Sequence, residues 1–228
     1  MPKLQFELNL PNQLTLLRIA LTPVFVAFLL SASLTLRQLS LVVFIVAALT
    51  DWYDGWIARR MGYSTRWGKF LDPLADKFLV IATLVSFVII DPLIPMWMIL
   101  IIVGRDILIT AMRYTGIKKG MALRTSHFGK VKTAFQMVSI VIIIMVFIVK
   151  SFGIHFFAQS EIDRHIKIKD AIELTMSLDN ANPYKWLIIG PYWLMVIVTI
   201  ITALSGFRYL MFNWKLLLPP YTPKGEKK

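Results

Sequence analysis

Two pairs of aspartates stand close together in the chain, at spacings that suit a shared metal site. Asp51 and Asp54 are three residues apart and Asp72 and Asp76 are four apart, so in helices each pair lies on one face. Four carboxylates packed together repel strongly in a low dielectric, and divalent cations relieve that repulsion most simply. Because the chain has no Cys, oxygen ligands dominate and favour Mg²⁺, Mn²⁺ or Ca²⁺ over Zn²⁺. The sequence therefore predicts a site for one or two such cations.

Small residues accompany these acids. Gly55 and Gly68 lack side chains and Ala58 is nearly as small, which would let a ligand approach the helix backbones closely. Arg59 follows directly and is available for a phosphate. A simpler alternative is that the acids cap helices or pair with nearby Arg and Lys, and Asp72, which precedes a proline, is typical of a helix N-cap. That alternative accounts for one or two of the acids, but not for all four together with the glycines.

The elements that must hold these residues are apolar helices. Of the 228 residues 57% are hydrophobic and 17% charged, and the mean hydropathy is +0.66, which indicates an all-α integral membrane protein. Segments of the length that crosses a bilayer predict six transmembrane helices, at about 14–33, 38–58, 70–90, 93–115, 131–150 and 186–207. Alternating apolar residues before Pro11 predict an N-terminal segment at the membrane interface.

Loop charge predicts the orientation. Lys and Arg collect in the segments at 59–69 and 118–132 and in the tail, whereas acids and bases balance over 151–185. Because cytoplasmic loops carry excess Lys and Arg, both termini and the aspartates are expected on the cytoplasmic side. Residues 1–228 then form a single transmembrane domain with 151–185 as an extracytoplasmic loop insertion. The net charge of +12 fits loops beside an anionic leaflet better than it fits nucleic acid.

The acids and their small neighbours together make one longer pattern. Read as one string, the eight positions fit DxxDGxxAR(x8)GxxxDxxxD: Asp51, Asp54, Gly55, Ala58, Arg59, Gly68, Asp72 and Asp76. This string resembles the complete signature of the CDP-alcohol phosphotransferase family. The likeness extends over roughly residues 9–150 and the last span, and is greatest to the bacterial members that use glycerol 3-phosphate, while 151–185 departs from their shorter pattern.

The resemblance implies a fold and a reaction. The fold is six transmembrane helices around a polar cavity open to the cytoplasm, commonly as a homodimer in the bacterial cytoplasmic membrane. The four aspartates are implied to hold Mg²⁺ or Mn²⁺, as two ions, at the diphosphate of CDP-diacylglycerol. Asp76 is also implied to be the general base. The residues implied along the nucleotide are Asn12, Thr15, Gly55, Ala58, Arg59 and Gly68.

Basic residues further along the chain bear on the acceptor alcohol. Arg105 lies inside the fourth span, Arg113 follows two turns later on roughly the same face, and Lys130 and Lys132 open the fifth span. Asp106 points about 100° away from Arg105 on the same helix. A cluster of cations suits an anionic acceptor and predicts glycerol 3-phosphate, since Arg offers a fork for phosphate oxygens. Inositol phosphate would need the same cations, and serine or phosphatidylglycerol, the acceptor of a cardiolipin synthase, are further alternatives.

A function of another class is a six-helix divalent-cation transporter whose aspartates conduct the metal. Transport sites lie near the bilayer midplane between broken helices. Here the acids are predicted at one mouth of the bundle, which favours the enzyme.

Overall fold

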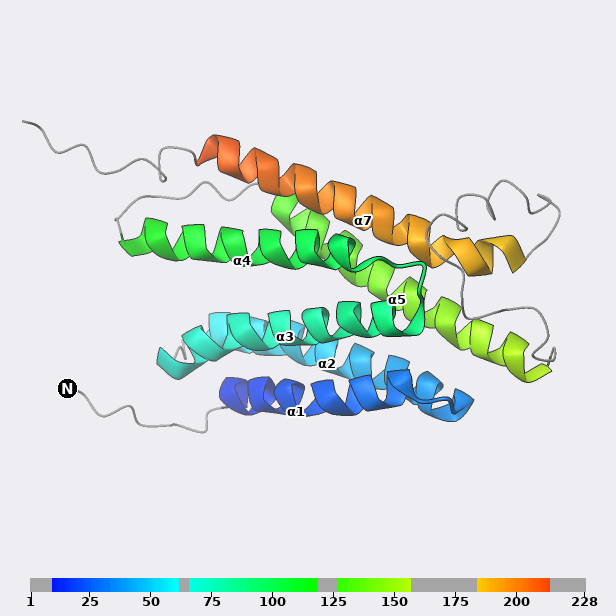
Figure 1. The fold of residues 1–228 in the computed structure, drawn as a ribbon. Coiled ribbons are helices and arrows are strands. Elements are labelled where there is room, and N and C mark those ends of the chain that lie inside the picture. Colours follow the sequence, from blue (N-terminus) through cyan, green and yellow to red (C-terminus); the bar gives the residue numbers. More distant parts are fainter. Residues whose placement is uncertain (1–9, 62–65, 119–126, 157–183, 214–228) are drawn as a thin grey trace, which may run out of the picture. The chain divides into compact units, whose positions relative to one another are not determined.

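The computed structural model describes residues 10–61, 66–118, 127–156 and 184–213, and these residues are helical without any strand (Figure 1). The helices are α1 (Leu10–Leu30), α2 (Leu34–Met61), α3 (Arg66–Ile90), α4 (Met96–Lys118), α5 (His127–Phe156) and α7 (Tyr184–Phe212). Each overlaps one predicted apolar span, with boundaries that differ by a few residues. The predicted all-α fold is confirmed. The N-terminal segment before Leu10 and most of the predicted insertion, residues 157–183, lie outside the described residues.

Three of these helices are long and apolar enough to cross a membrane, through Gln13–Leu30, Val131–Ser151 and Trp186–Phe212. Shorter apolar stretches occupy Leu34–Thr50 of α2 and Lys77–Ile90 of α3. Crossing by all six helices stays a prediction.

The described helices contribute to two compact units. The first unit comprises residues 1–96 and 140–193, and in it α1 packs against both α2 and α3 (Figure 1). Its buried core includes the ring pairs Phe25–Phe44 and Phe87–Phe147, each with centroids 5.4 Å apart. The second unit comprises residues 97–139 and 194–228. It has its own small core, formed by Ile109, Met112, Tyr209 and Leu210.

An ion pair ties the turn between α3 and α4 to the rest of the first unit. Lys150 Nζ lies 2.8 Å from Asp91 Oδ2 and 3.4 Å from the carbonyl oxygen of Ile188. The other carboxylate oxygen of Asp91 accepts a hydrogen bond of 3.1 Å from the backbone N–H of Leu93. Asp91 is 5% exposed, so these partners take the place of water around its carboxylate.

We expect Asp91→Ala to destabilise the protein by about 2 kcal/mol, or roughly 4–8 °C in apparent melting temperature, because it removes the carboxylate partner of Lys150 and the acceptor of the Leu93 N–H. Asp91→Asn keeps an acceptor for Leu93 but removes the charge, so its loss should be smaller. Thermal unfolding in detergent measures both. Equal melting temperatures for Asp91→Ala and the unchanged protein would show that the pair contributes nothing.

Candidate functional site

The structure places the predicted metal ligands by their backbone. Asp51 and Asp54 lie near the C-terminal end of α2, and Asp72 and Asp76 lie in α3, with only residues 62–65 between the two helices. The four side chains lie outside the described residues. Since α3 begins at Arg66, six residues before Asp72, the interpretation of Asp72 as a helix N-cap is wrong.

The helical register shows which face of each helix carries these acids. On α2 the buried residues Ser40, Phe44 and Ala47 form a stripe at intervals of four and three, and the next positions along that stripe are Asp51 and Asp54. The two positions thus share the helical register of the buried residues of α2. A position facing lipid would have continued an exposed stripe instead.

The same holds for α3. Its buried residues Leu79, Thr83 and Ser86 are 2%, 0% and 1% exposed, and they continue the register of Asp72 and Asp76. Both pairs of acids therefore extend buried faces of helices that pack on α1. Ionisable residues on the inner face of a membrane bundle are costly, which makes them candidates for function.

Polar residues of α1 are buried in the same unit. Thr15 and Arg18 are fully buried, and Arg18 Nε donates a hydrogen bond of 3.3 Å to the carbonyl oxygen of Ala47, one turn before Asp51. Thr50 Oγ1 donates to the same carbonyl oxygen at 2.7 Å. The sequence analysis gave Arg18 no role. A cation inside an apolar span is nevertheless a sign of a functional residue, and this sign could have identified Arg18.

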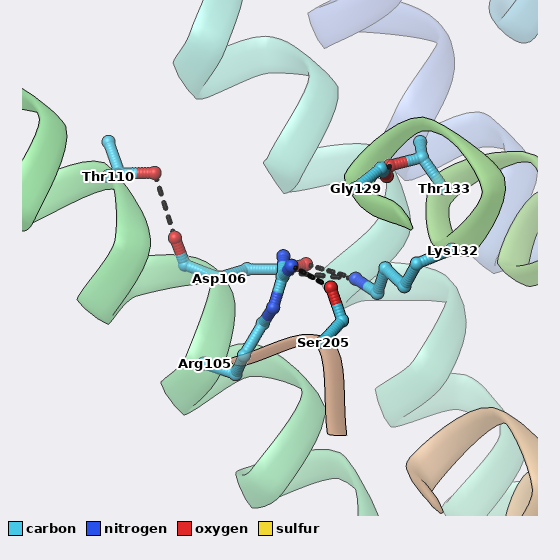
Figure 2. A network of polar contacts seen from close by, with 7 residues as sticks. All are labelled: Arg105, Asp106, Thr110, Gly129, Lys132, Thr133 and Ser205. Carbon is cyan, nitrogen blue, oxygen red and sulfur yellow. Dashed lines mark hydrogen bonds and ion pairs between the residues drawn. The ribbon is translucent and has the colours of Figure 1, made fainter. Parts of the chain in front are cut away.

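A second group of polar side chains lies in the second unit, and we call it the Asp106 cluster: Arg105 and Asp106 of α4, Lys132 of α5 and Ser205 of α7 (Figure 2). Arg105 Nη1 lies 2.7 Å from Asp106 Oδ1, and Arg105 Nη2 donates to Ser205 Oγ at 2.8 Å. Lys132 Nζ lies 2.9 and 3.0 Å from the two oxygens of Asp106. Three helices thus meet in one network.

The Asp106 cluster carries a net positive charge in a partly buried setting. Two cations face one carboxylate, and the side chains of Lys132, Arg105 and Asp106 are 3%, 15% and 25% exposed. Arg105 Nε is buried and has no hydrogen-bond partner within the described part of the chain. A buried donor without an acceptor is destabilising, and an anion bound there would supply the acceptor.

A glycine allows Arg105 to adopt this position. A Cβ atom at Gly206 of α7 would lie 2.7 Å from Cγ of Arg105, closer than carbon atoms approach without one of them moving. Gly206 follows Ser205, so α7 both admits the stem of Arg105 and binds its end. Sequence reasoning named neither residue, because nothing in the sequence pairs a stretch of α7 with the middle of α4.

The predicted acceptor residues have different outcomes. Arg105 and Lys132 both contact Asp106, whereas Arg113 is exposed and joins no contact of the Asp106 cluster among the described residues. The side chain of Lys130 lies outside the described residues. The expectation that Asp106 points away from Arg105 is wrong, because the flexible arginine side chain curls back to its neighbour.

Other predicted residues cannot be placed beyond their helices. Among the predicted nucleotide ligands, Thr15 has a described side chain. The others are placed only by the backbone of their helices: Asn12, Gly55, Ala58, Arg59 and Gly68. Among the side chains that are described, no three of the types His, Cys, Asp and Glu gather as a metal site would require. The fit of a divalent cation therefore depends on the all-oxygen donor chemistry of the four aspartates and on their register along α2 and α3.

Comparison with known proteins gives consistent matches. Residues 8–160 match the family model described as CDP-alcohol phosphatidyltransferase. A Bacillus subtilis protein named CDP-diacylglycerol–glycerol-3-phosphate 3-phosphatidyltransferase is 39% identical over 144 residues, which cover 58% of this chain and 74% of the relative. A Salmonella paratyphi A protein of the same name is 37% identical over 140 residues, covering 59% and 75%.

One relative matches over almost the full length. A Yersinia enterocolitica protein, again named CDP-diacylglycerol–glycerol-3-phosphate 3-phosphatidyltransferase, is 30% identical over 220 residues, which cover 94% of this chain and 100% of the relative. The matched region of the family model contains the whole aspartate signature and both cations of the Asp106 cluster. The chain belongs to the CDP-alcohol phosphatidyltransferase family of enzymes.

Proposed function

We propose that this enzyme transfers the phosphatidyl group of CDP-diacylglycerol to glycerol 3-phosphate, giving phosphatidylglycerophosphate and CMP. The acceptor hydroxyl oxygen forms a bond to the lipid-side phosphorus, and the bond from that phosphorus to the CMP oxygen breaks. CMP leaves with the electron pair, and the proton of the hydroxyl passes to a base. Family membership and the names of the three relatives support this reaction.

The observation that carries the choice of acceptor is the Asp106 cluster. Arg105 and Lys132, 27 positions apart in sequence, share one carboxylate, and the buried Nε–H of Arg105 has no acceptor among the residues that the structure describes. Phosphate oxygens suit both groups, as a charge partner for Lys132 and a hydrogen-bond acceptor for Arg105. An alcohol without a phosphate group, such as serine, would not offer these two cations a phosphate to bind.

The aspartate signature is proposed to act on the donor. Asp51, Asp54, Asp72 and Asp76 would hold two Mg²⁺ or Mn²⁺ ions, which neutralise charge on the diphosphate and stabilise the departing CMP. Asp76 would take the proton of the acceptor hydroxyl, a step that a positioned carboxylate performs well when it lies near the nucleophile. The helical register that both acid pairs share with buried residues of α2 and α3 supports this assignment.

The nucleotide is proposed to lie along residues near these acids. Gly55, Ala58 and Gly68 leave room for it close to the helix backbones, and Arg59 can pair with a phosphate. Asn12 and Thr15 are the proposed contributions of α1, and the burial of Thr15 on a helix that packs against α2 and α3 agrees with this.

The membrane arrangement is also a proposal. Six helices would surround a polar cavity open to the cytoplasm, with both termini on that side, residues 151–185 outside and the whole chain as one domain. The three relatives named above come from bacteria, so the bacterial cytoplasmic membrane is the proposed location, and a homodimer the proposed assembly. Charge asymmetry of the loops supports the orientation.

An acceptor panel tests the specificity. Purified protein is supplied with CDP-diacylglycerol, Mg²⁺ or Mn²⁺, and one alcohol at a time, and CMP release is measured. Glycerol 3-phosphate should support turnover, while inositol phosphate, serine and phosphatidylglycerol should not. Turnover with one of these three and none with glycerol 3-phosphate would overturn the proposed acceptor. Metal uptake into vesicles without any CMP release would favour the transporter.

Gly206→Ala should weaken the acceptor step. The new methyl group displaces the stem of Arg105 and breaks its contact with Ser205, so we expect the KM for glycerol 3-phosphate to rise by about 10-fold with the KM for CDP-diacylglycerol unchanged. Gly104→Ala is the matched control, because a Cβ atom there meets nothing within 4 Å. Equal acceptor KM values for the two variants would contradict the role given to Gly206.

A further inference from the structure

Asp106 lies at the centre of its cluster, although nothing in the proposed reaction uses a carboxylate there. Its Oδ1 atom contacts both Arg105 Nη1, at 2.7 Å, and Lys132 Nζ, at 2.9 Å. Its Oδ2 atom contacts Lys132 Nζ again, at 3.0 Å. The backbone carbonyl oxygen of the same residue accepts a hydrogen bond from Thr110 Oγ1, which is local to α4 (Figure 2).

The shared carboxylate sets the separation of the two cations. Because both nitrogens touch the same oxygen, they lie within about 6 Å of each other, at which distance two positive charges in a poorly hydrated setting repel strongly. Lys132 is only 3% exposed, so water cannot compensate its charge. Without Asp106 the two side chains would be driven apart, and the flexible lysine stem would move most easily.

The donors that remain on Arg105 indicate where an anion would bind. Nη1 is directed to Asp106 and Nη2 to Ser205, so the guanidinium is fixed at two corners, while Nε is buried without an acceptor in the described region. A fixed arginine loses little conformational entropy when it binds a ligand. The cluster also keeps one net positive charge for the anion after Asp106 is counted.

We propose that Asp106 is a positioning residue for the acceptor: it holds Lys132 of α5 and Arg105 of α4 in the relative placement that binds the phosphate group of the acceptor alcohol. This inference rests on the proposed function, in which that phosphate belongs to glycerol 3-phosphate. Asp106 itself does not touch the substrate. Its effect passes through the two cations, so loss of its carboxylate affects acceptor binding and not donor binding.

Two variants separate positioning from mere charge balance. Asp106→Glu keeps the negative charge but displaces the carboxylate by one methylene, whereas Asp106→Asn keeps the size and removes the charge. The positioning role predicts that each raises the KM for glycerol 3-phosphate, by about 5-fold for Glu and 20-fold or more for Asn. The KM for CDP-diacylglycerol should stay within about 2-fold. A carboxylate needed only for charge balance would leave Asp106→Glu with normal kinetics.

A double-mutant cycle tests whether Asp106 acts through Lys132. The losses in kcat/KM for glycerol 3-phosphate are measured for Asp106→Asn, Lys132→Met and the double variant, which has no unpaired charge between these two positions. The double variant should lose much less than the product of the single losses, because the two residues share one task. Multiplicative losses would contradict the proposal, and so would equal rises in both KM values for Asp106→Asn.

Asp91→Asn is the matched control, because it removes a carboxylate from another lysine pair of the same chain. It should lower the melting temperature and leave the acceptor KM unchanged. The unchanged protein is assayed first. If it does not turn over glycerol 3-phosphate, both the proposed acceptor and the proposed role of Asp106 are contradicted. Turnover of glycerol 3-phosphate with normal kinetics in Asp106→Asn and Asp106→Glu would contradict the role of Asp106 alone.

Discussion

Asp76→Asn should reduce CMP release by about 10³-fold or more, because the variant loses both a charged metal ligand and the proposed base. Asparagine keeps the shape of the side chain and one oxygen, so the helix and its packing should survive. Initial rates of CMP release with saturating CDP-diacylglycerol and glycerol 3-phosphate measure the effect. Melting temperature and detergent-solubilised yield show that the variant is folded.

The control for this variant is Asp91→Asn, which changes the same residue type at a position outside the signature. Its rate should remain close to that of the unchanged protein. If Asp76→Asn retains more than about one tenth of the rate, Asp76 is not the base. In the unchanged protein, removal of metal by a chelator should abolish CMP release. Addition of Mn²⁺ or Mg²⁺ should restore it.

Arg105→Met is the second variant for which a large effect is expected. Removing the guanidinium breaks the contacts of Arg105 with Asp106 and Ser205 and takes away the donors proposed for the acceptor phosphate, so kcat/KM for glycerol 3-phosphate should fall by about 10²-fold. Arg105→Lys keeps the charge but not the planar fork, and should lose about 10-fold. Steady-state kinetics at fixed CDP-diacylglycerol measure both.

Arg113→Met is the comparison within the same helix. Because Arg113 is exposed and outside the Asp106 cluster, we expect a smaller loss from it than from Arg105→Met. Equal losses would mean that the two arginines share the acceptor, as their spacing in the sequence predicts. Normal acceptor kinetics in Arg105→Met would place the acceptor site elsewhere.

The fold was largely predictable because lipid imposes simple rules on a sequence. Each of the six predicted apolar segments is helical, and a helix satisfies its backbone hydrogen bonds within one segment, as lipid requires. The helix ends were less predictable. The helix α3 begins at Arg66 and not near Phe70, because helical hydrogen bonds continue into charged sequence where apolar periodicity has already stopped.

The candidate site was predictable where it is local in sequence. The aspartates and their glycines lie within one stretch of chain, so spacing alone marks them as candidates. Asp106, Ser205 and Gly206 act through contacts between distant segments, and no periodicity links the middle of α4 to a serine 100 positions later. The angle of about 100° between neighbouring residues on a helix wrongly separated Asp106 from Arg105. The long arginine side chain bends back far enough to contact Asp106.

The central claim is the transfer of a phosphatidyl group to glycerol 3-phosphate. The most direct measurement supplies the purified protein with CDP-diacylglycerol, Mn²⁺ or Mg²⁺ and glycerol 3-phosphate labelled in its carbon skeleton, and then counts label in the extracted lipid and CMP in the aqueous phase. We predict one labelled lipid for each CMP, and no labelled lipid without CDP-diacylglycerol. Release of CMP with the label remaining in the aqueous phase would contradict the claim.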